Sequence, residues 1–253
     1  MPTTYGNDIV YCLKSHCGVR GYCRQKWVLQ VQIICKFSNE RTCKRNKDVQ
    51  GLSCGFEDKY FFYYSGNPKA GGGKQIGVAT SDSPTGPFVD LGHPIVTDSP
   101  TGNGQQIDVD VFTDPVSGKS YLYWGNGYMA GAELNEDMVS IKKETITVMT
   151  PEGGTLQDYA YREAAYVFYR NGLYYFMWSV DDTGSPNYHV AYGTSTSPLG
   201  PIKVAKNPVI LIQNPEKEIY GPAHNAVLQV PGTDKWYIVY HRRPLGETAA
   251  NSR

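Results

Sequence analysis

One aromatic strand pattern occurs four times along the chain. Each copy follows a turn-forming residue and is rich in the aromatic and β-branched residues that favour strands. Corresponding positions in successive copies are 60, 54 and 62 residues apart. The copies occupy residues 58–65, 118–125, 172–179 and 234–241. Four strands of one pattern at nearly even spacing indicate a repeated unit of about sixty residues.

A second phrase repeats between these strands. Residues 80–88 read TSDSPTGPF and residues 194–202 read TSTSPLGPI, each after a strand-like run. The Ser-Pro-x-Gly-Pro core can form only a turn or loop. Repeats near sixty residues with several strands each are typical of a β-propeller. A β-sandwich with chance aromatic similarity is the alternative, but it does not require even spacing. We therefore predict an all-β propeller with four recognisable blades.

Charge and cysteine content divide the chain at residue 57. Residues 1–56 hold nine Lys/Arg, three Asp/Glu and all six cysteines, whereas residues 57–253 hold fifteen Lys/Arg and twenty-one Asp/Glu. No cysteine spacing is the C-x-x-C of a common zinc site, and a disulfide framework would need an oxidising compartment. We predict an irregular leader at 1–56 and a propeller domain at 57–253. The propeller part lacks a basic stripe for nucleic acid and an apolar run long enough for a membrane.

Carboxylates in two strand-like segments are the candidates for chemistry. Glu163 precedes the apolar and aromatic run Tyr166–Phe168. It is either in a functional cleft or an exposed strand residue paired with Arg162. Asp108 and Asp110 alternate with aliphatic residues, so both should lie on one face of a strand. Asp114 precedes proline and is most simply a turn former.

A histidine and three aromatic residues lie close in sequence to these segments. His224 precedes an apolar strand, and a lone histidine is more often structural than a ligand. Trp124, Trp178 and Tyr220 could stack on the apolar faces of sugar rings. Their alternative role is core packing.

Three motifs together resemble those of glycoside hydrolase family 43. They are IDVDVFTDP at 107–115, YREAAYVFYRNGLYYFMWS at 161–179 and YGPAHNAV at 220–227, and their order and spacing agree with the family. The resemblance implies a five-bladed propeller that hydrolyses arabinose- or xylose-containing plant polysaccharides with inversion. It leaves open the sugar, the linkage, and exo or endo action.

The resemblance also implies roles for individual residues. Glu163 would be the general acid, and Asp108 would tune its pKa and orient it. His224 would line the central channel, where it could contact a structural calcium ion; no cofactor would be required. Arg253 falls where the family often places a substrate-binding arginine.

The chain departs from the family pattern at the catalytic base. The family base is an aspartate in an Asp-Pro phrase on the first blade, but residues 1–56 contain only Asp8 and Asp48, and neither precedes proline. Asp8, which strand-like residues follow, is the one substitute that we identify. The usual Glu-Gly-Pro around the acid is Glu163-Ala164-Ala165. We expect a chain that lacks the first blade and the closing strand, and an impaired catalyst.

Alternative functions follow from that departure. A propeller without a base could bind sugars without cleaving them, or could serve as an interaction scaffold on its rim. Relatives of this kind are usually extracellular, although the first ten residues lack the basic start and apolar core of a signal peptide. We expect a monomer whose partner is a plant cell-wall polysaccharide or oligosaccharide, and no nucleic-acid or membrane partner.

Overall fold

The computed structural model describes the strands at 32–36, 42–45 and 52–55, and then residues 59–68, 71–83, 85–149 and 160–243. Within these ranges the regular structure is β, apart from two short 3-10 helices, η1 (Lys143–Thr145) and η3 (Pro215–Lys217). No helix in these ranges is long and apolar enough to cross a membrane.

The strands form three four-stranded antiparallel sheets and two two-stranded ones. The first sheet has the order β1 (Gln32–Lys36), β4 (Lys59–Gly66), β5 (Gln75–Ser81), β6 (Val89–Asp90). The second runs through β7 (Asp110–Thr113), β8 (Ser120–Trp124), β9 (Met129–Glu133), β10 (Thr147–Met149). The third runs through β11 (Tyr161–Arg170), β12 (Leu173–Val180), β13 (His189–Ser195), β14 (Lys203–Ile212). The two-stranded sheets are β15 (Ala223–Gln229) with β16 (Trp236–His241), and β2 (Thr42–Arg45) with β3 (Leu52–Gly55).

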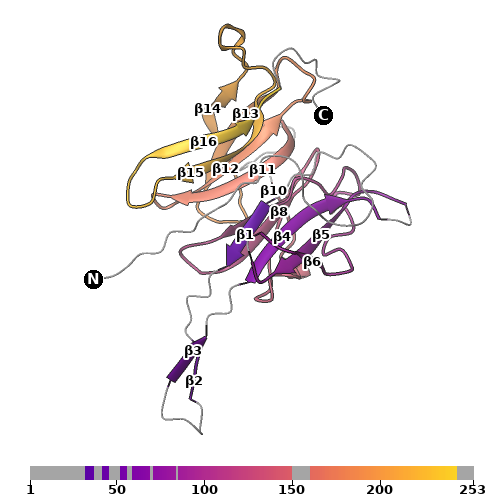
Figure 1. The fold of residues 1–253 in the computed structure, drawn as a ribbon. Helices are drawn as coiled ribbons and strands as arrows, with labels where there is room; N and C mark the ends of the chain where they lie inside the picture. The colour runs from indigo at the N-terminus through magenta and orange to yellow at the C-terminus, as the bar shows by residue number, and fades with distance from the viewer. Residues whose placement is uncertain are drawn as a thin grey trace.

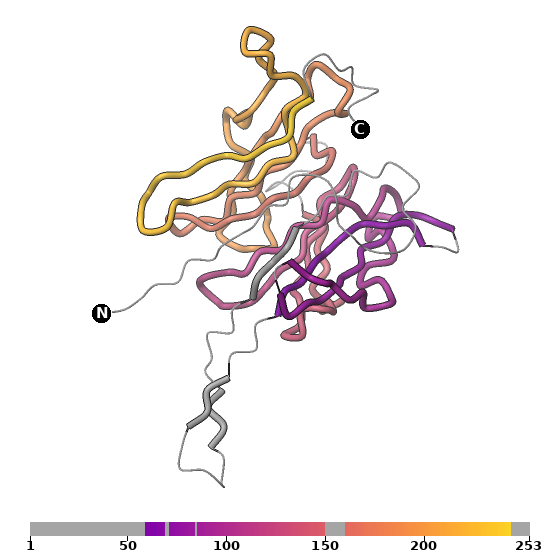
Figure 2. Tube along the Cα trace, viewed as in Figure 1, coloured from indigo at the N-terminus to yellow at the C-terminus, as the bar shows by residue number. Residues whose placement is uncertain are grey.

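Successive sheets meet along their first strands. β7 contacts β1 on one side and β11 on the other, and β11 in turn contacts β15. Figure 2 follows the chain through the sheets in sequence order, from the indigo residues after 58 to the yellow residues near 241. Sheets of consecutive antiparallel strands that meet along their first strands are propeller blades. The predicted all-β propeller with four blades is confirmed (Figure 1).

The four aromatic phrases are the second strands of these blades, β4, β8, β12 and β16. In the complete blades this strand has a neighbour on both sides, and β8 is buried along its whole length. Such a strand must be apolar on both faces. That is why the aromatic phrase is the strongest repeated signal in the sequence.

Apolar side chains between adjacent blades form the core. Three clusters fill the interfaces between the first and second, second and third, and third and fourth blades. Trp124 lies in the first cluster and Trp178 in the second, and both are fully buried. An indole with no exposed face cannot stack on a sugar ring. The predicted sugar contacts of both tryptophans are therefore wrong, and core packing is their role.

The repeated Ser-Pro-x-Gly-Pro phrase is the turn that follows the third strand of a blade. Gly86 and Gly200 occupy equivalent places in the two copies, with φ of 81° and 76°. In the third blade this turn packs on the second: Tyr123 donates a hydrogen bond of 2.8 Å to the carbonyl of Pro198. The side chain of Leu199 lies so close to Gly131 that a Cβ there would be 2.9 Å from it. The turn thus helps to hold two blades together.

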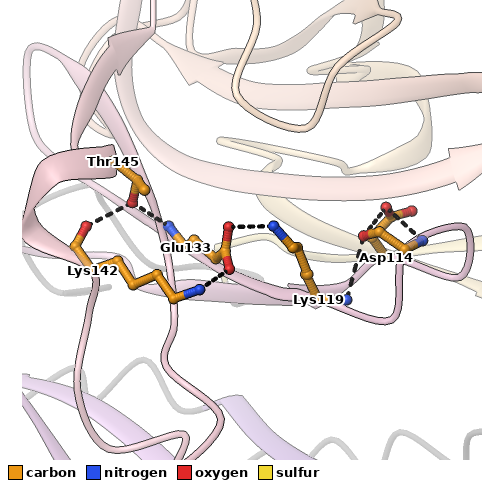
Figure 3. A network of polar contacts seen from close by, with 6 residues as sticks. Asp114, Lys119, Glu133, Lys142 and Thr145 are labelled. Atoms are coloured by element: carbon orange, nitrogen blue, oxygen red, sulfur yellow. Dashed lines mark hydrogen bonds and ion pairs between the residues drawn. The ribbon is translucent and has the colours of Figure 1, made fainter.

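A polar network joins the turn between β7 and β8 to the end of β9 and to the connection between β9 and β10 (Figure 3). The Glu133 carboxylate accepts hydrogen bonds from Lys142 and, at 3.0 Å, from Lys119. Thr145 of η1 accepts from the backbone N–H of Glu133 at 2.9 Å. Asp114 accepts from the backbone N–H groups of Val116 and Ser117, as expected of a turn former.

The first blade that the structure describes, the sheet of β1, β4, β5 and β6, takes its first strand from the segment that was predicted to be a leader. β1 pairs with β4 along all five of its residues, from Gln32 opposite Tyr63 to Lys36 opposite Lys59. The ribbon of β2 and β3 lies between them in the chain. Strand β1 thus belongs to the first sheet, ahead of residue 57. The predicted domain boundary at residue 57 stays a prediction. So does the irregular structure predicted for the rest of residues 1–56. Asp8 lies outside the described residues.

Candidate active site

The candidate residues meet at one end of the blades. Antiparallel pairing places the start of the first strand, the end of the second and the loop after it at the same end of a blade. Asp108 lies two residues before β7, Glu163 is the third residue of β11, and His224 is the second of β15. Three successive blades therefore each contribute one candidate residue.

Glu163 is half-buried and has two hydrogen-bond partners. The hydroxyl of Tyr188 donates to Oε1 at 2.9 Å, and the Nδ2 of Asn126 donates to Oε2 at 3.2 Å. The neighbouring Arg162 pairs instead with Asp182, at 3.6 Å. Glu163 is thus not the exposed, arginine-paired residue of the alternative interpretation.

A β-bulge shapes the strand around Glu163. The register between β11 and β12 shifts on both sides of this residue, and Ala164 has a φ of 63°. A bulge takes a residue out of the ladder and redirects its backbone groups. The N–H of Ala164 donates to Oδ2 of Asp108 at 3.1 Å. Ala164 occupies the place of the family's usual glycine, which suits a positive φ better.

Asp108 is a nearly buried carboxyl beside Glu163; its side chain is 13% exposed. Burial raises its pKa to about 8, and the nearby charge of Glu163 adds to this effect. The hydrogen bond from Ala164 and the charge of Lys74 act in the opposite direction. Lys74 lies directly before β5, in the connection from β4.

Asp110 ties the second blade to the third. It is buried, and its Oδ2 accepts a hydrogen bond of 2.8 Å from the backbone N–H of Val167. Asp108 and Asp110 therefore both face β11, whereas Val109 and Val111 pack in the first core cluster. The predicted division of this segment into two faces is confirmed. The contact of Asp110 is structural.

His224 stands opposite Asp108, with 3.9 Å between its Nδ1 and Oδ2 of the aspartate. Its backbone has a φ of 36°, and its N–H donates to Oγ of Ser179 at 3.1 Å. Burial lowers the pKa of the imidazole to about 3, with a contribution from nearby His241. The ring is therefore neutral near pH 7. Within the described part of the chain, no three His, Cys, Asp or Glu side chains form a group that could hold a metal ion.

Two further predicted contacts lie at or beyond the edge of the site. Tyr220 is 39% exposed, in the loop before β15, and its carbonyl accepts from the N–H of Arg243 at 2.9 Å. Its exposed ring is compatible with sugar stacking. Arg253 lies outside the described residues, so its role stays a prediction.

Sequence reasoning missed Asn126 and Tyr188. Both lie in loops at the site end of the blades, Asn126 between β8 and β9 and Tyr188 just before β13. The Asn126-Gly127 pair signals a turn, and Tyr188 opens a strand-like run. These signals are local. Neither shows that the two side chains meet Glu163, which is 37 residues from one and 25 from the other.

Comparison with known proteins agrees with this arrangement. The model of glycosyl hydrolases family 43 matches residues 53–252. "Beta-D-galactofuranosidase xynD" of Aspergillus niger is 38% identical over 201 residues, which are 78% of this chain and 54% of that protein. "Arabinoxylan arabinofuranohydrolase" of Bacillus subtilis is 30% identical over 217 residues, covering 75% of this chain and 38% of the relative.

Solved structures give the same result. The crystal structure of a thermostable family 43 glycoside hydrolase superposes with a TM-score of 0.63 and 26% identity, over 73% of this chain and 62% of the other. The chain belongs to glycoside hydrolase family 43. It spans about half the length of the Aspergillus relative and less of the Bacillus one.

Proposed function

We propose that this chain carries the acid half of an inverting O-glycosyl hydrolase site, with Glu163 as general acid and Asp108 as the carboxyl that tunes and orients it. The observation that carries this proposal is the placement of Glu163. It is half-buried and held at both oxygens by uncharged partners, beside the nearly buried carboxyl of Asp108.

The chemistry follows from these contacts. A protonated Glu163 gives its proton to the oxygen that leaves the sugar, while a water molecule attacks the anomeric carbon from the opposite face. The N–H of Ala164 fixes Asp108, so the two carboxyls keep a constant relation. The base that activates the water is a third carboxylate, about 6.5–9.5 Å from the acid in inverting enzymes. The described residues do not identify it.

The proposed substrates are arabinose- or xylose-containing plant glycans. The two relatives named above are a galactofuranosidase and an arabinofuranohydrolase, so we add β-D-galactofuranosides to the candidate substrates. The rings of α-L-arabinofuranose and β-D-galactofuranose share one configuration and differ in the exocyclic carbon chain. An open furanoside pocket could accept both.

A panel of nitrophenyl glycosides tests the proposal. The α-L-arabinofuranoside, β-D-galactofuranoside and β-xyloside would be assayed together with linear arabinan and xylan, using the full chain and Glu163→Gln. Turnover that Glu163→Gln abolishes supports the proposal. Binding of a polysaccharide without turnover would identify a sugar-binding propeller, and neither binding nor turnover would favour a protein-binding scaffold.

A calcium ion in the channel would rely on backbone carbonyl, amide or water oxygens rather than on a cluster of acidic side chains in the described part of the chain. Calcium takes six to eight oxygen ligands, whereas His224 offers a nitrogen, and the described residues bring no group of three acidic or histidine ligands together. No step of the proposed reaction depends on a metal.

Location and assembly are part of the same proposal. We propose an extracellular monomer, because polysaccharide substrates lie outside the cell and each blade interface is made within one chain. Immunoblots of culture medium and cell lysate test the location. Light scattering of the purified protein tests the assembly.

A further inference from the structure

The two partners of Glu163 come from different blades, and neither carries a charge. Tyr188 follows β12 of the third blade, and Asn126 follows β8 of the second. Arg162, the nearest residue in sequence that is a cation, is paired with Asp182 on the rim. The carboxyl group that is proposed to transfer the proton is thus held by a phenol and an amide.

These two groups have a chemical property in common. A tyrosine hydroxyl can donate or accept a hydrogen bond, and an asparagine side chain offers an NH₂ donor on one side and a carbonyl acceptor on the other. Both can therefore bond to a carboxylate or, after a rotation, to a carboxylic acid. A lysine or arginine partner can only donate and would favour the ionised form.

We propose that Tyr188 and Asn126 are positioning residues that form an uncharged clamp, which holds Glu163 in both of its protonation states. The shorter bond, 2.9 Å from Tyr188, fixes Oε1. Oε2, with the longer bond of 3.2 Å from Asn126, is the oxygen that carries the transferred proton. This inference rests on the proposed role of Glu163 as general acid.

Surrounding contacts hold both clamp residues in place. Tyr188 is buried and its ring stacks on His241, with 5.9 Å between ring centroids and 22° between planes. The Asn126 loop is attached to β11 by a 2.7 Å hydrogen bond from the N–H of Gly127 to the carbonyl of Arg162. On its other side, a Cβ at Gly104 would lie 2.3 Å from the carbonyl oxygen of Asn126, so the two loops are in close contact.

Leaving-group dependence tests the clamp in the full chain. Nitrophenolate leaves with little help from an acid, whereas the sugar alcohol of an α-1,5-arabinobiose needs full protonation. We expect Tyr188→Phe to reduce kcat on arabinobiose about 10- to 100-fold, to affect the nitrophenyl arabinofuranoside much less, and to change KM little. Asn126→Ala should show the same selectivity. Equal losses on both substrates, or none, would overturn the proposal.

Tyr166→Phe is the matched control. The Tyr166 hydroxyl, in the third blade, donates a hydrogen bond of 3.0 Å to the carbonyl of Val227 in the fourth blade. It makes no hydrogen bond to Glu163. Tyr166→Phe should leave unchanged the ratio of kcat on arabinobiose to kcat on the nitrophenyl arabinofuranoside. A general effect of losing a buried tyrosine hydroxyl would instead appear in both variants.

A second readout does not need turnover. In protein labelled with carbon-13 at glutamate carboxyls, the Glu163 signal is identified by its loss in Glu163→Gln. That signal should move in Tyr188→Phe and stay in place in Tyr166→Phe. An unmoved signal overturns the clamp. A moved signal in a protein that cleaves none of the substrates supports the clamp and rejects the proposed function.

Discussion

Three residues of the candidate site have backbone conformations that side chains rarely adopt. Asp108, Ala164 and His224 have φ values of 58°, 63° and 36°. Each such residue costs on the order of 1–3 kcal/mol unless local contacts compensate, and they concentrate at functional sites. Here they direct groups toward one another. The turned N–H of Ala164 reaches Asp108, and His224 approaches the same carboxylate.

Replacing Glu163 should change the titration of Asp108. Burial is the main cause of the raised pKa of Asp108, and the charge of Glu163 is the second. Glu163→Gln removes only the second, so the pKa of Asp108 should fall from about 8 while staying above its ordinary value of 3.8. Carboxyl carbon-13 NMR across pH 3–10 measures this. An unchanged midpoint would mean that the two carboxyls do not interact.

His224 should make stability depend on pH. Its folded pKa of about 3 lies below the ordinary 6.5. Between these values the unfolded chain binds a proton on this residue and the folded chain does not, so acid destabilises the fold, by at most about 1.4 kcal/mol per pH unit. Urea unfolding at pH 7 and pH 4.5 should show that His224→Gln loses less stability than the parent. A difference that is constant with pH would contradict this.

Strand β11 owes its position to carboxylates of the preceding blade. Asp108 accepts from the N–H of Ala164, and Asp110 accepts from that of Val167. The bulge around Glu163 leaves gaps in the ladder between β11 and β12. Asp108 accepts from Ala164 within this irregular stretch, whereas Val167 is in register with Phe176 and gives its N–H to Asp110 of the second blade.

Loss of the second carboxylate should therefore destabilise the protein. Asp110→Ala leaves the buried N–H of Val167 without this acceptor and opens a small cavity, which together cost about 2–4 kcal/mol. Asp110→Asn retains an acceptor oxygen and should cost less. Urea denaturation at pH 7 gives both values. Equal costs for the two variants would show that hydrogen bonding by Asp110 is not what stabilises the strand.

The sequence predicted strands well where their side chains face the core on both sides. The aromatic phrase is most buried in β8 and β12, which have a strand on both sides, whereas β16, which pairs with β15 alone within the described residues, is half-buried or exposed along its length. Strand β1 was missed because no copy of that repeat marks it, and its evidence is its pairing with β4. The role of Trp124 was mistaken for a related reason. The sequence shows that a large aromatic is present, but not whether it faces a sugar or an adjacent blade.

At the scale of the whole molecule, the site depends on the packing of several blades. Asp108 comes from the second, Glu163 and Tyr188 from the third, and His224 and His241 from the fourth. Family motifs identified Glu163, Asp108 and His224 because each lies in a recognisable strand phrase. Tyr188 and Asn126 could not be found in that way, since the contact of Tyr188 arises when β11, β12 and β13 pair within the third blade, and that of Asn126 when the second and third blades pack together.

The 253-residue chain should turn over its substrate slowly. The described residues supply the acid and its neighbouring carboxyl, while residues 1–56 contain no Asp-Pro phrase for the base. General-base assistance contributes about 100- to 10,000-fold, so kcat/KM should fall short of that of a full-length family 43 relative by a factor in this range. Both proteins would be assayed on the same arabinofuranoside, xyloside and galactofuranoside, with Glu163→Gln as the control for contaminating activity. The prediction is wrong if turnover equals that of the relative and is lost in Glu163→Gln. In that case another carboxylate of this chain acts as the base. Asp8→Asn would be the first variant to test for that role.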